Sequence, residues 1–75
     1  MEQIDINKRF MYHPLKEGQT EKYLTIRAVA KTLAELVNEV CPESREKSLA
    51  MTALEESVMW AYASIARNDI KGEQL

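Results

Sequence analysis

The stretch YLTIRAVAKTLAELVNEV, residues 23–40, decides the fold. Its apolar positions recur at alternating intervals of three and four residues. They are Tyr23, Ile26, Ala30, Leu33, Val37 and Val40. This is the a/d spacing of helices that pack along one another, and the opposite face carries charged and polar residues. The pattern predicts a helix over residues 20–40, with Thr20 as its N-cap and Glu21 favourably placed at the positive helix start.

A second stretch repeats the pattern after an interruption at Pro42. Residues 44–68 carry an apolar seam with the same alternating spacing, formed by Met51, Leu54, Val58, Ala61 and Ile65. Pro42 disfavours helix in the residue before it, and either Pro42 or Ser44 suits the start of the next helix. The link is then only a few residues long, which favours antiparallel neighbours. The expected fold class is all-α, an antiparallel two-helix hairpin.

The rest of the chain flanks this hairpin within a single 75-residue domain. Residues 1–19 are predicted to be an extended N-terminal arm, and residues 69–75 a frayed tail. Cys41 is the only cysteine, so no disulfide is expected, and one Cys with one His makes neither a metal site nor a cofactor site. A domain of this size is marginally stable alone, so regular helix packing or oligomerisation is expected to stabilise it.

The segment VMWAYASIA, residues 58–66, is apolar on more faces than one hairpin partner can cover. Its surplus residues lie off the seam and are expected to form an oligomer interface: Met59, Trp60, Tyr62 and Ala63. The N-terminal arm, with Phe10, Met11 and Tyr12, is available to cover part of this surface. The remainder would be a large exposed apolar patch, which usually marks an interface. The sequence therefore predicts a homo-oligomer of helical hairpins.

Charge and hydropathy exclude two kinds of partner. The formal net charge is −2, whereas a general binder of polymeric nucleic acid shows a basic stripe. The opening MEQIDINKRF lacks the apolar segment of a signal peptide, and no run approaches the ~18 apolar residues of a membrane span. We expect a soluble cytoplasmic protein without a membrane partner.

Few residues are suited to catalysis, and we expect no enzyme. His13 has no nucleophile or acid at a suggestive spacing, so a local hydrogen bond in the turn before Pro14 is its favoured role. Cys41 fits a small packed residue at the hairpin turn, although a reactive thiol at the start of the second helix stays open. Glu55 and Glu56 are adjacent and point about 100° apart on a helix, so they form no catalytic pair.

Aromatic and cationic side chains offer a second kind of function, which is binding. Tyrosine and tryptophan rings stack on nucleobases, and the chain has such rings at Tyr12, Tyr23, Trp60 and Tyr62. Cations suited to phosphate oxygens stand on the same helices, at Arg27, Lys31 and Arg67. From the residues alone, a nucleotide site and ordinary packing with surface charge both remain open.

The combination of motifs resembles a known family. FMYHP at 10–14, IRAVAKTLAEL at 26–36 and CPESREKSLAMTALEESVMWAYASIAR at 41–67 are similar to the phage helical-hairpin family of anti-CBASS and anti-Thoeris sponges. The resemblance implies a phage immune-evasion protein that works as a homohexamer in the infected host. It would bind cyclic oligonucleotides or cyclic ADP-ribose-type signals between protomers and release them unchanged.

The resemblance also implies site residues. Tyr12 matches a tyrosine that stacks on a base, and Arg27 a basic residue that holds phosphate. His13 and Lys31 are expected beside them, while Val29 and Arg67 match a second pocket, for cyclic trinucleotides. Tyr62 departs from the family pattern, where asparagine is usual in WANA. The alternative function is a structural or protein-interaction hairpin of a phage or prophage with no small ligand.

Overall fold

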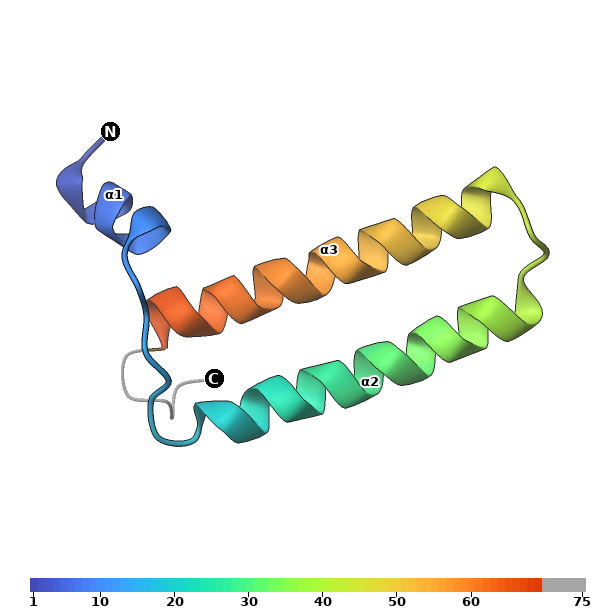
Figure 1. Cartoon of the computed structure of the whole chain (residues 1–75), viewed down its shortest axis with the longest axis horizontal. Helices are drawn as coiled ribbons and strands as arrows, with labels where there is room; N and C mark the ends of the chain where they lie inside the picture. The colour runs from blue at the N-terminus through green and yellow to red at the C-terminus, as the bar shows by residue number, and fades with distance from the viewer. Residues whose placement is uncertain (70–75) are drawn as a thin grey trace.

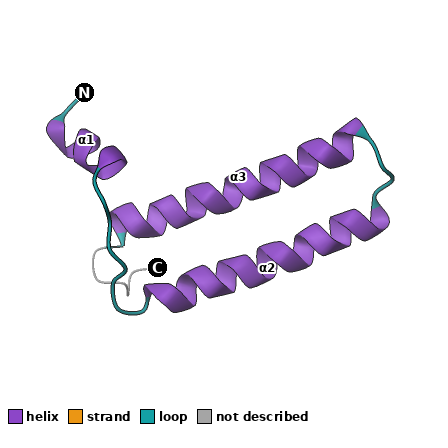
Figure 2. Ribbon diagram, viewed as in Figure 1, coloured by secondary structure: helices purple, strands orange, loops and turns teal. Residues whose placement is uncertain are grey.

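The computed structural model describes residues 1–69 of the chain, and this part is helical throughout its regular structure. It contains α1 (Gln3–Phe10), α2 (Gln19–Val40) and α3 (Arg45–Asn68), with no strand among the described residues. α2 and α3 run side by side in opposite directions, and α1 lies beyond the end of α3 (Figure 1). Figure 2 shows that short loops connect the three helices. The expected all-α class and the helical hairpin are confirmed, whereas the homo-oligomer stays a prediction.

α2 begins at a glycine turn rather than at the predicted N-cap. Gly18 has φ 84° and ψ −13°, the values of the third residue in a type II turn, which glycine adopts without steric cost. The backbone N–H of Gln19 closes this turn by donating to the carbonyl of Lys16 at 3.1 Å. Thr20 therefore lies inside the helix, and the prediction that it caps α2 is wrong. The turn geometry fixes the start instead.

The loop between α2 and α3 agrees with the sequence prediction at the point where α3 begins. Cys41 is the C-cap of α2 and precedes Pro42, which cannot continue the helix. Ser44 is the N-cap of α3, because its hydroxyl accepts a hydrogen bond from the backbone N–H of Lys47 at 3.1 Å. Of the two predicted starts, Ser44 is confirmed and Pro42 lies in the loop. Cys41 therefore belongs to the negative end of α2 and not to the start of α3, where a thiolate would be favoured.

The N-terminal arm is not extended over its whole length, so that prediction is wrong for residues 3–10. These residues form α1, which has Asp5 in its first turn and Lys8 and Arg9 in its last turn. This order of charges complements the helix dipole. The amide of Gln3 also donates to Asn7 one turn later, at 2.9 Å. Residues 11–18 then connect α1 to α2 without regular structure.

The predicted frayed tail begins one residue too early. Asp69 is the C-cap of α3 and is only 7% exposed. Residues 70–75 of that tail lie outside the described residues. Among the described helices, none is long and apolar enough to cross a membrane.

The two seams meet as predicted, with two exceptions on α2. All five predicted seam residues of α3 are half-buried, as are four of the six on α2. Leu33 is 45% exposed and Val40 is 64% exposed. A straight helix drifts by ~20° per heptad relative to a strict seven-residue repeat, so Leu33 turns outward while Ala34 is half-buried instead. Val40 is the last residue of α2, beside the loop.

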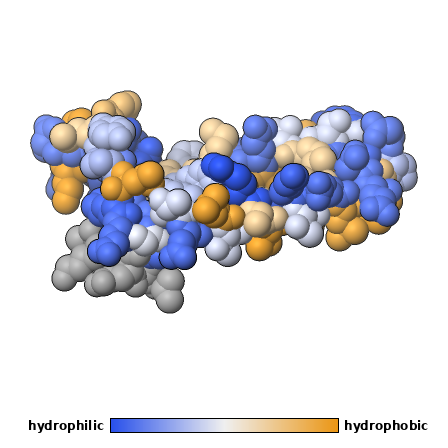
Figure 3. All heavy atoms as spheres, turned by 60° about the horizontal axis from the view of Figure 1, so that its bottom comes forward, coloured by the Kyte–Doolittle hydropathy of each residue, from blue (hydrophilic) through white to orange (hydrophobic). Residues whose placement is uncertain are grey.

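The single hairpin has no fully buried apolar side chain among its described residues. Large apolar side chains stand at the surface on every helix, among them Phe10 on α1, Leu36 on α2 and Trp60 on α3. Figure 3 shows such hydrophobic side chains interspersed with polar ones along one face of the molecule. Phe10, Met11 and Tyr12 are themselves 78%, 59% and 86% exposed, so within one chain the arm does not bury them against α3.

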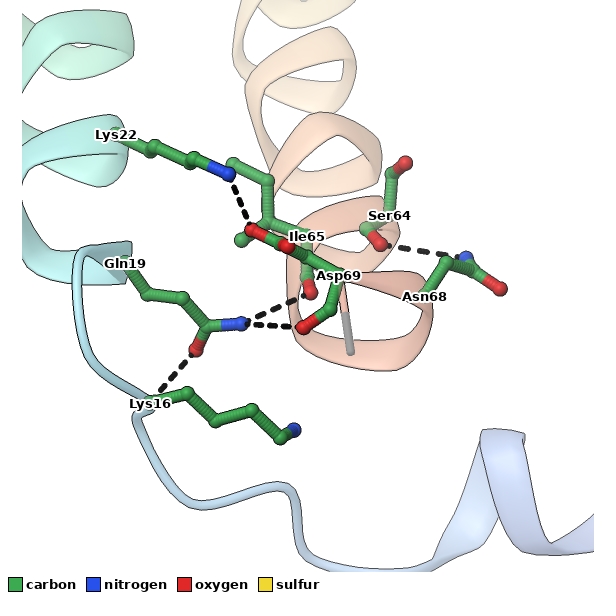
Figure 4. A network of polar contacts seen from close by, with 7 residues as sticks. All are labelled: Lys16, Gln19, Lys22, Ser64, Ile65, Asn68 and Asp69. Atoms are coloured by element: carbon green, nitrogen blue, oxygen red, sulfur yellow. Dashed lines mark hydrogen bonds and ion pairs between the residues drawn. The ribbon is translucent and has the colours of Figure 1, made fainter. Parts of the chain in front are cut away.

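Polar side chains are buried at the end of the hairpin where the arm crosses it. Gln19 is 1% exposed, and its amide nitrogen donates to the carbonyls of Ile65 and Asp69, each at 3.2 Å. Its amide oxygen accepts the backbone N–H of Lys16 at 2.9 Å (Figure 4). Lys22 forms an ion pair with the carboxylate of Asp69. Gln19 thereby ties the glycine turn and α2 to two carbonyls at the C-terminal end of α3.

At the loop end of the hairpin, a side chain of one long helix again bonds a carbonyl at the C-terminus of the other. Lys47 is 9% exposed, and its ammonium donates to the carbonyl of Asn38 at 2.9 Å and pairs with Glu43. Asn38 stands in the last turn of α2, where carbonyls have no partner within the helix. A side chain from the opposite helix therefore satisfies the C-terminus of both α2 and α3.

Candidate functional site

A cation and two aromatic rings meet across the two long helices near the arm. Arg27 of α2 donates from Nε to the hydroxyl of Tyr62 on α3, at 3.2 Å. Its guanidinium carbon lies 5.8 Å from the centroid of the Tyr62 ring, within cation–π range. Tyr62 in turn meets Tyr23 of α2 edge to face, with ring centroids 5.0 Å apart and planes at 82°. The three side chains form one connected cluster that holds α2 against α3.

This cluster lines an open recess of about 460 Å³, which we name the Tyr23 recess. Its walls are otherwise mainly apolar and come from the arm and both long helices: Leu15, Thr20, Tyr23, Leu24, Arg27, Tyr62, Ala63 and Ala66. Leu15 is 65% exposed and Leu24 54% exposed, so their apolar surface is available to a flat, apolar group. The recess combines such surface with one cation, Arg27.

A second recess, of about 410 Å³, lies on the other side of the Arg27–Tyr62 pair, and we name it the Lys31 recess. Arg27 and Lys31 stand one helical turn apart and both line it, together with Glu55 and Met59. Arg27 and Tyr62 thus belong to both recesses. The structure brings the two predicted phosphate-binding cations of α2 to a common surface.

Tyr12 and His13 lie apart from Arg27 within one chain. Tyr12 is in the loop between α1 and α2, is 86% exposed, and lines neither of the two recesses. His13 is half-buried, and its Nε2 lies 2.8 Å from the carbonyl of Lys8. A carbonyl only accepts, so Nε2 carries the hydrogen, and the ring closes the C-terminus of α1. The local role expected for His13 is confirmed.

Val29 and Arg67, the expected second pocket, line different parts of the surface among residues 1–69. Val29 is 65% exposed on α2 and lines an apolar recess with Leu33 and Leu36. Arg67 is half-buried in the last turn of α3 and is not part of that lining.

The four residues expected at an oligomer interface fall into two groups. Met59 and Trp60 are each 62% exposed, and Trp60 donates from its indole N–H to Glu56 of the preceding turn at 3.2 Å. Tyr62 and Ala63 are half-buried and line the Tyr23 recess. Within one chain, Tyr62 is thus a partner of Arg27, and Met59 and Trp60 are the members that remain at the surface.

The contact between Arg27 and Tyr62 was not predicted. One signal for it exists in the sequence, because Tyr23 and Arg27 stand one turn apart and share a face of α2. The missing information is the register of α3 against α2, which decides that Tyr62 meets this face. Gln19 was missed for a similar reason, since its partners lie 46 and 50 residues away.

The described residues contain no group of three or more His, Cys, Asp or Glu side chains placed to hold a metal ion.

A family model for the Acb2/Tad1 hairpin domain matches residues 2–66, which include α1, α2 and nearly all of α3. No curated protein and no solved structure matches the chain.

Proposed function

The chain belongs to the Acb2/Tad1 hairpin family, the anti-CBASS and anti-Thoeris sponges, and from this premise we propose that it binds cyclic nucleotide signals and sequesters them without cleavage. The ligands are cyclic oligonucleotides or cyclic ADP-ribose-type molecules. The protein would act in the cytoplasm of the infected bacterium, where withholding the signal keeps a defence effector inactive.

The observation that carries this proposal is the position of the Arg27 guanidinium, which Tyr62 holds between the two recesses. Guanidinium groups bind phosphate oxygens through paired, charge-assisted hydrogen bonds. Lys31 adds a second cation on one side, and the apolar walls of the Tyr23 recess suit a nucleobase on the other. A nucleotide offers both a phosphate and a flat base, so one ligand can use both features.

Tyr12 supports placing the site between protomers. A tyrosine ring that is 86% exposed in one chain has its stacking face available to a base or to another copy. In a symmetric assembly each residue is supplied more than once, so Tyr12 of one protomer can complete the Arg27 site of its neighbour. We propose a homohexamer, and the second pocket would likewise join Val29 and Arg67 from different protomers, with His13 beside Tyr12.

The lining groups favour holding a ligand over cleaving it. The cations Arg27 and Lys31 bind through charge and hydrogen bonds, and the rings of Tyr23 and Tyr62 through stacking. Hydrolysis of a phosphodiester requires in addition an activated water or nucleophile, usually with a metal or a positioned base. The proposed role needs only the first set of groups.

Isothermal titration of the full-length protein with a panel of cyclic di- and trinucleotides and cyclic ADP-ribose isomers tests the proposal. At least one member is expected to bind, and Arg27→Ala is expected to weaken that binding about tenfold or more, because charged hydrogen bonds are lost. Arg45→Ala is the matched control, since Arg45 is exposed at the first position of α3, at the loop end. If no nucleotide of the panel binds and a pull-down recovers one stoichiometric protein partner, the structural hairpin is favoured instead.

A further inference from the structure

The contact between Tyr62 and Arg27 points to a role for Tyr62 beyond its place in the walls of both recesses. Resting on the proposed function, we propose that Tyr62 is the positioning residue that holds the Arg27 guanidinium in the orientation that receives a ligand phosphate. The family pattern has asparagine at this place, so the role concerns how this chain in particular prepares its cation.

The hydrogen bond to Tyr62 occupies only Nε of the Arg27 guanidinium. Arg27 donates from Nε to the hydroxyl of Tyr62, and it has no further partner among the described residues. Its two terminal nitrogens therefore keep their N–H groups for an anion. Bidentate phosphate recognition needs two parallel N–H donors from one planar group. Fixing Nε orients that plane and leaves the terminal edge open.

The Tyr62 ring restrains the guanidinium from a second direction. The guanidinium carbon lies 5.8 Å from the ring centroid, and the hydroxyl of the same ring accepts from Nε. Tyr23 packs edge-on against that ring at a centroid distance of 5.0 Å and limits its rotation. Tyr62 is half-buried while Arg27 is exposed, so a packed ring restrains a cation at the surface. An arginine restrained before binding loses less side-chain entropy when the phosphate arrives.

The chemistry of lysine provides a way to isolate this contact. A lysine at position 27 retains the positive charge but has no Nε–H to donate to Tyr62 and no planar group to orient. If Tyr62 acts through Arg27, the hydroxyl of Tyr62 matters only while an arginine is present. A double-mutant cycle of Arg27→Lys with Tyr62→Phe measures this coupling.

Isothermal titration with cyclic di-AMP provides the binding measurement for the four proteins of the cycle. Tyr62→Phe keeps the ring and removes the hydroxyl, and it is expected to weaken binding three- to tenfold in the wild-type background. In the Arg27→Lys background the same substitution is expected to change binding less than twofold. Equal losses in both backgrounds would overturn the proposal, because Tyr62 would then act without Arg27.

Tyr23→Phe is the matched control. It removes a hydroxyl from the neighbouring ring of the same cluster, and that hydroxyl has no hydrogen-bond partner among the described residues. Any loss of affinity is expected to be smaller than that of Tyr62→Phe and to be equal in the wild-type and Arg27→Lys backgrounds, because the hydroxyl of Tyr23 does not bond Arg27. A loss as large as that of Tyr62→Phe would attribute the effect to the packing of the cluster and would overturn the positioning role.

Nuclear magnetic resonance of the ligand-free protein tests the contact independently of any nucleotide. The Arg27 Nε–H signal is expected to exchange slowly with water and to become fast in Tyr62→Phe, but not in Tyr23→Phe. A fast-exchanging Arg27 signal in the wild type would overturn the proposal even if cyclic di-AMP binds. A slow signal without cyclic di-AMP binding would retain the contact and remove its part in binding this nucleotide, which separates the inference from the proposed function.

Discussion

The two ends of the hairpin bury polar side chains, whereas its middle buries apolar side chains only in part. At the ends, the buried residues among those described are polar: Gln19 and Asp69 near the arm, and Lys47 near the loop. Gln19 and Lys47 bond carbonyls of the opposite helix, and among the described residues no buried side-chain nitrogen or oxygen lacks a partner. Along the middle, the seam residues are only half-buried, and apolar residues such as Leu33 stand at the surface.

This difference shows which part of the fold one chain completes. A helix end needs a few directed hydrogen bonds, and one partner helix can supply them. An apolar helix face needs to be surrounded, and two helices have only one mutual interface. The ends therefore fix the register and direction of α2 and α3, whereas the middle leaves apolar surface uncovered within one chain. The nucleotide site that we propose lies where this surface meets Arg27.

The largest effect is expected from a charge placed on the apolar face of the middle. Leu33→Asp would bury an unpaired carboxylate if Leu33 contacts another copy, which costs several kcal/mol. We expect the assembly to dissociate at least a hundredfold more readily in sedimentation experiments. Glu35→Lys, an exposed charge change two residues away, should leave the assembly intact. An unchanged oligomer in Leu33→Asp would show that this face is not shared between copies.

The second effect concerns the end of the hairpin near the arm. Gln19→Leu removes the hydrogen bonds that a 1% exposed side chain makes with the backbone N–H of Lys16 and with the carbonyls of Ile65 and Asp69. Unsatisfied buried groups cost ~1–3 kcal/mol each, so we expect the free energy of unfolding to fall by ~2–3 kcal/mol in urea denaturation. Gln3→Leu, an exposed glutamine of α1, should change it by less than ~0.5 kcal/mol. Equal stability of the two variants would contradict the role of Gln19.

We expect substitutions at the loop end of the hairpin to lower the free energy of unfolding less than substitutions at the end near the arm. Lys47→Met keeps the apolar stem and removes the hydrogen bond to the carbonyl of Asn38 and the pair with Glu43, which is 90% exposed. Since one interior bond is lost, we expect a decrease of ~1–2 kcal/mol in the same denaturation assay. Lys16→Met serves as its control, because the Lys16 side chain is exposed.

The smallest effect is expected for the arm. Lys8 donates to the side-chain oxygen of Asn68 at 3.0 Å, an exposed contact that joins α1 to the end of α3. Lys8→Met should leave global stability unchanged within error but speed amide hydrogen exchange in α1. Unaltered exchange would mean that this contact does not hold the arm.

The fold could be predicted to a large extent because periodicity is local information. The seams around Ile26 and Val58, the stop before Pro42 and the cap at Ser44 each follow from neighbours in the sequence. The buried roles of Gln19 and Lys47 could not, because nothing local distinguishes them from the exposed Gln3 and Lys31. Their partners become neighbours only after α2 and α3 have paired.

The candidate site divides in the same way. Arg27 and Lys31 stand one turn apart, so their common surface on α2 could be predicted. The partnership of Arg27 with Tyr62 depends on the register between two helices, and a site that includes Tyr12 depends on how chains assemble. Neither is encoded in the spacing within one segment.

Native mass spectrometry of the full-length protein incubated with the cyclic nucleotide panel, followed by heat release of what is bound, tests the central claim most directly. We predict oligomers that carry nucleotide and that yield it with unchanged mass after denaturation. A monomer without ligand would contradict the shared site between copies. A linearised or hydrolysed nucleotide would contradict sequestration, because the protein would then be an enzyme.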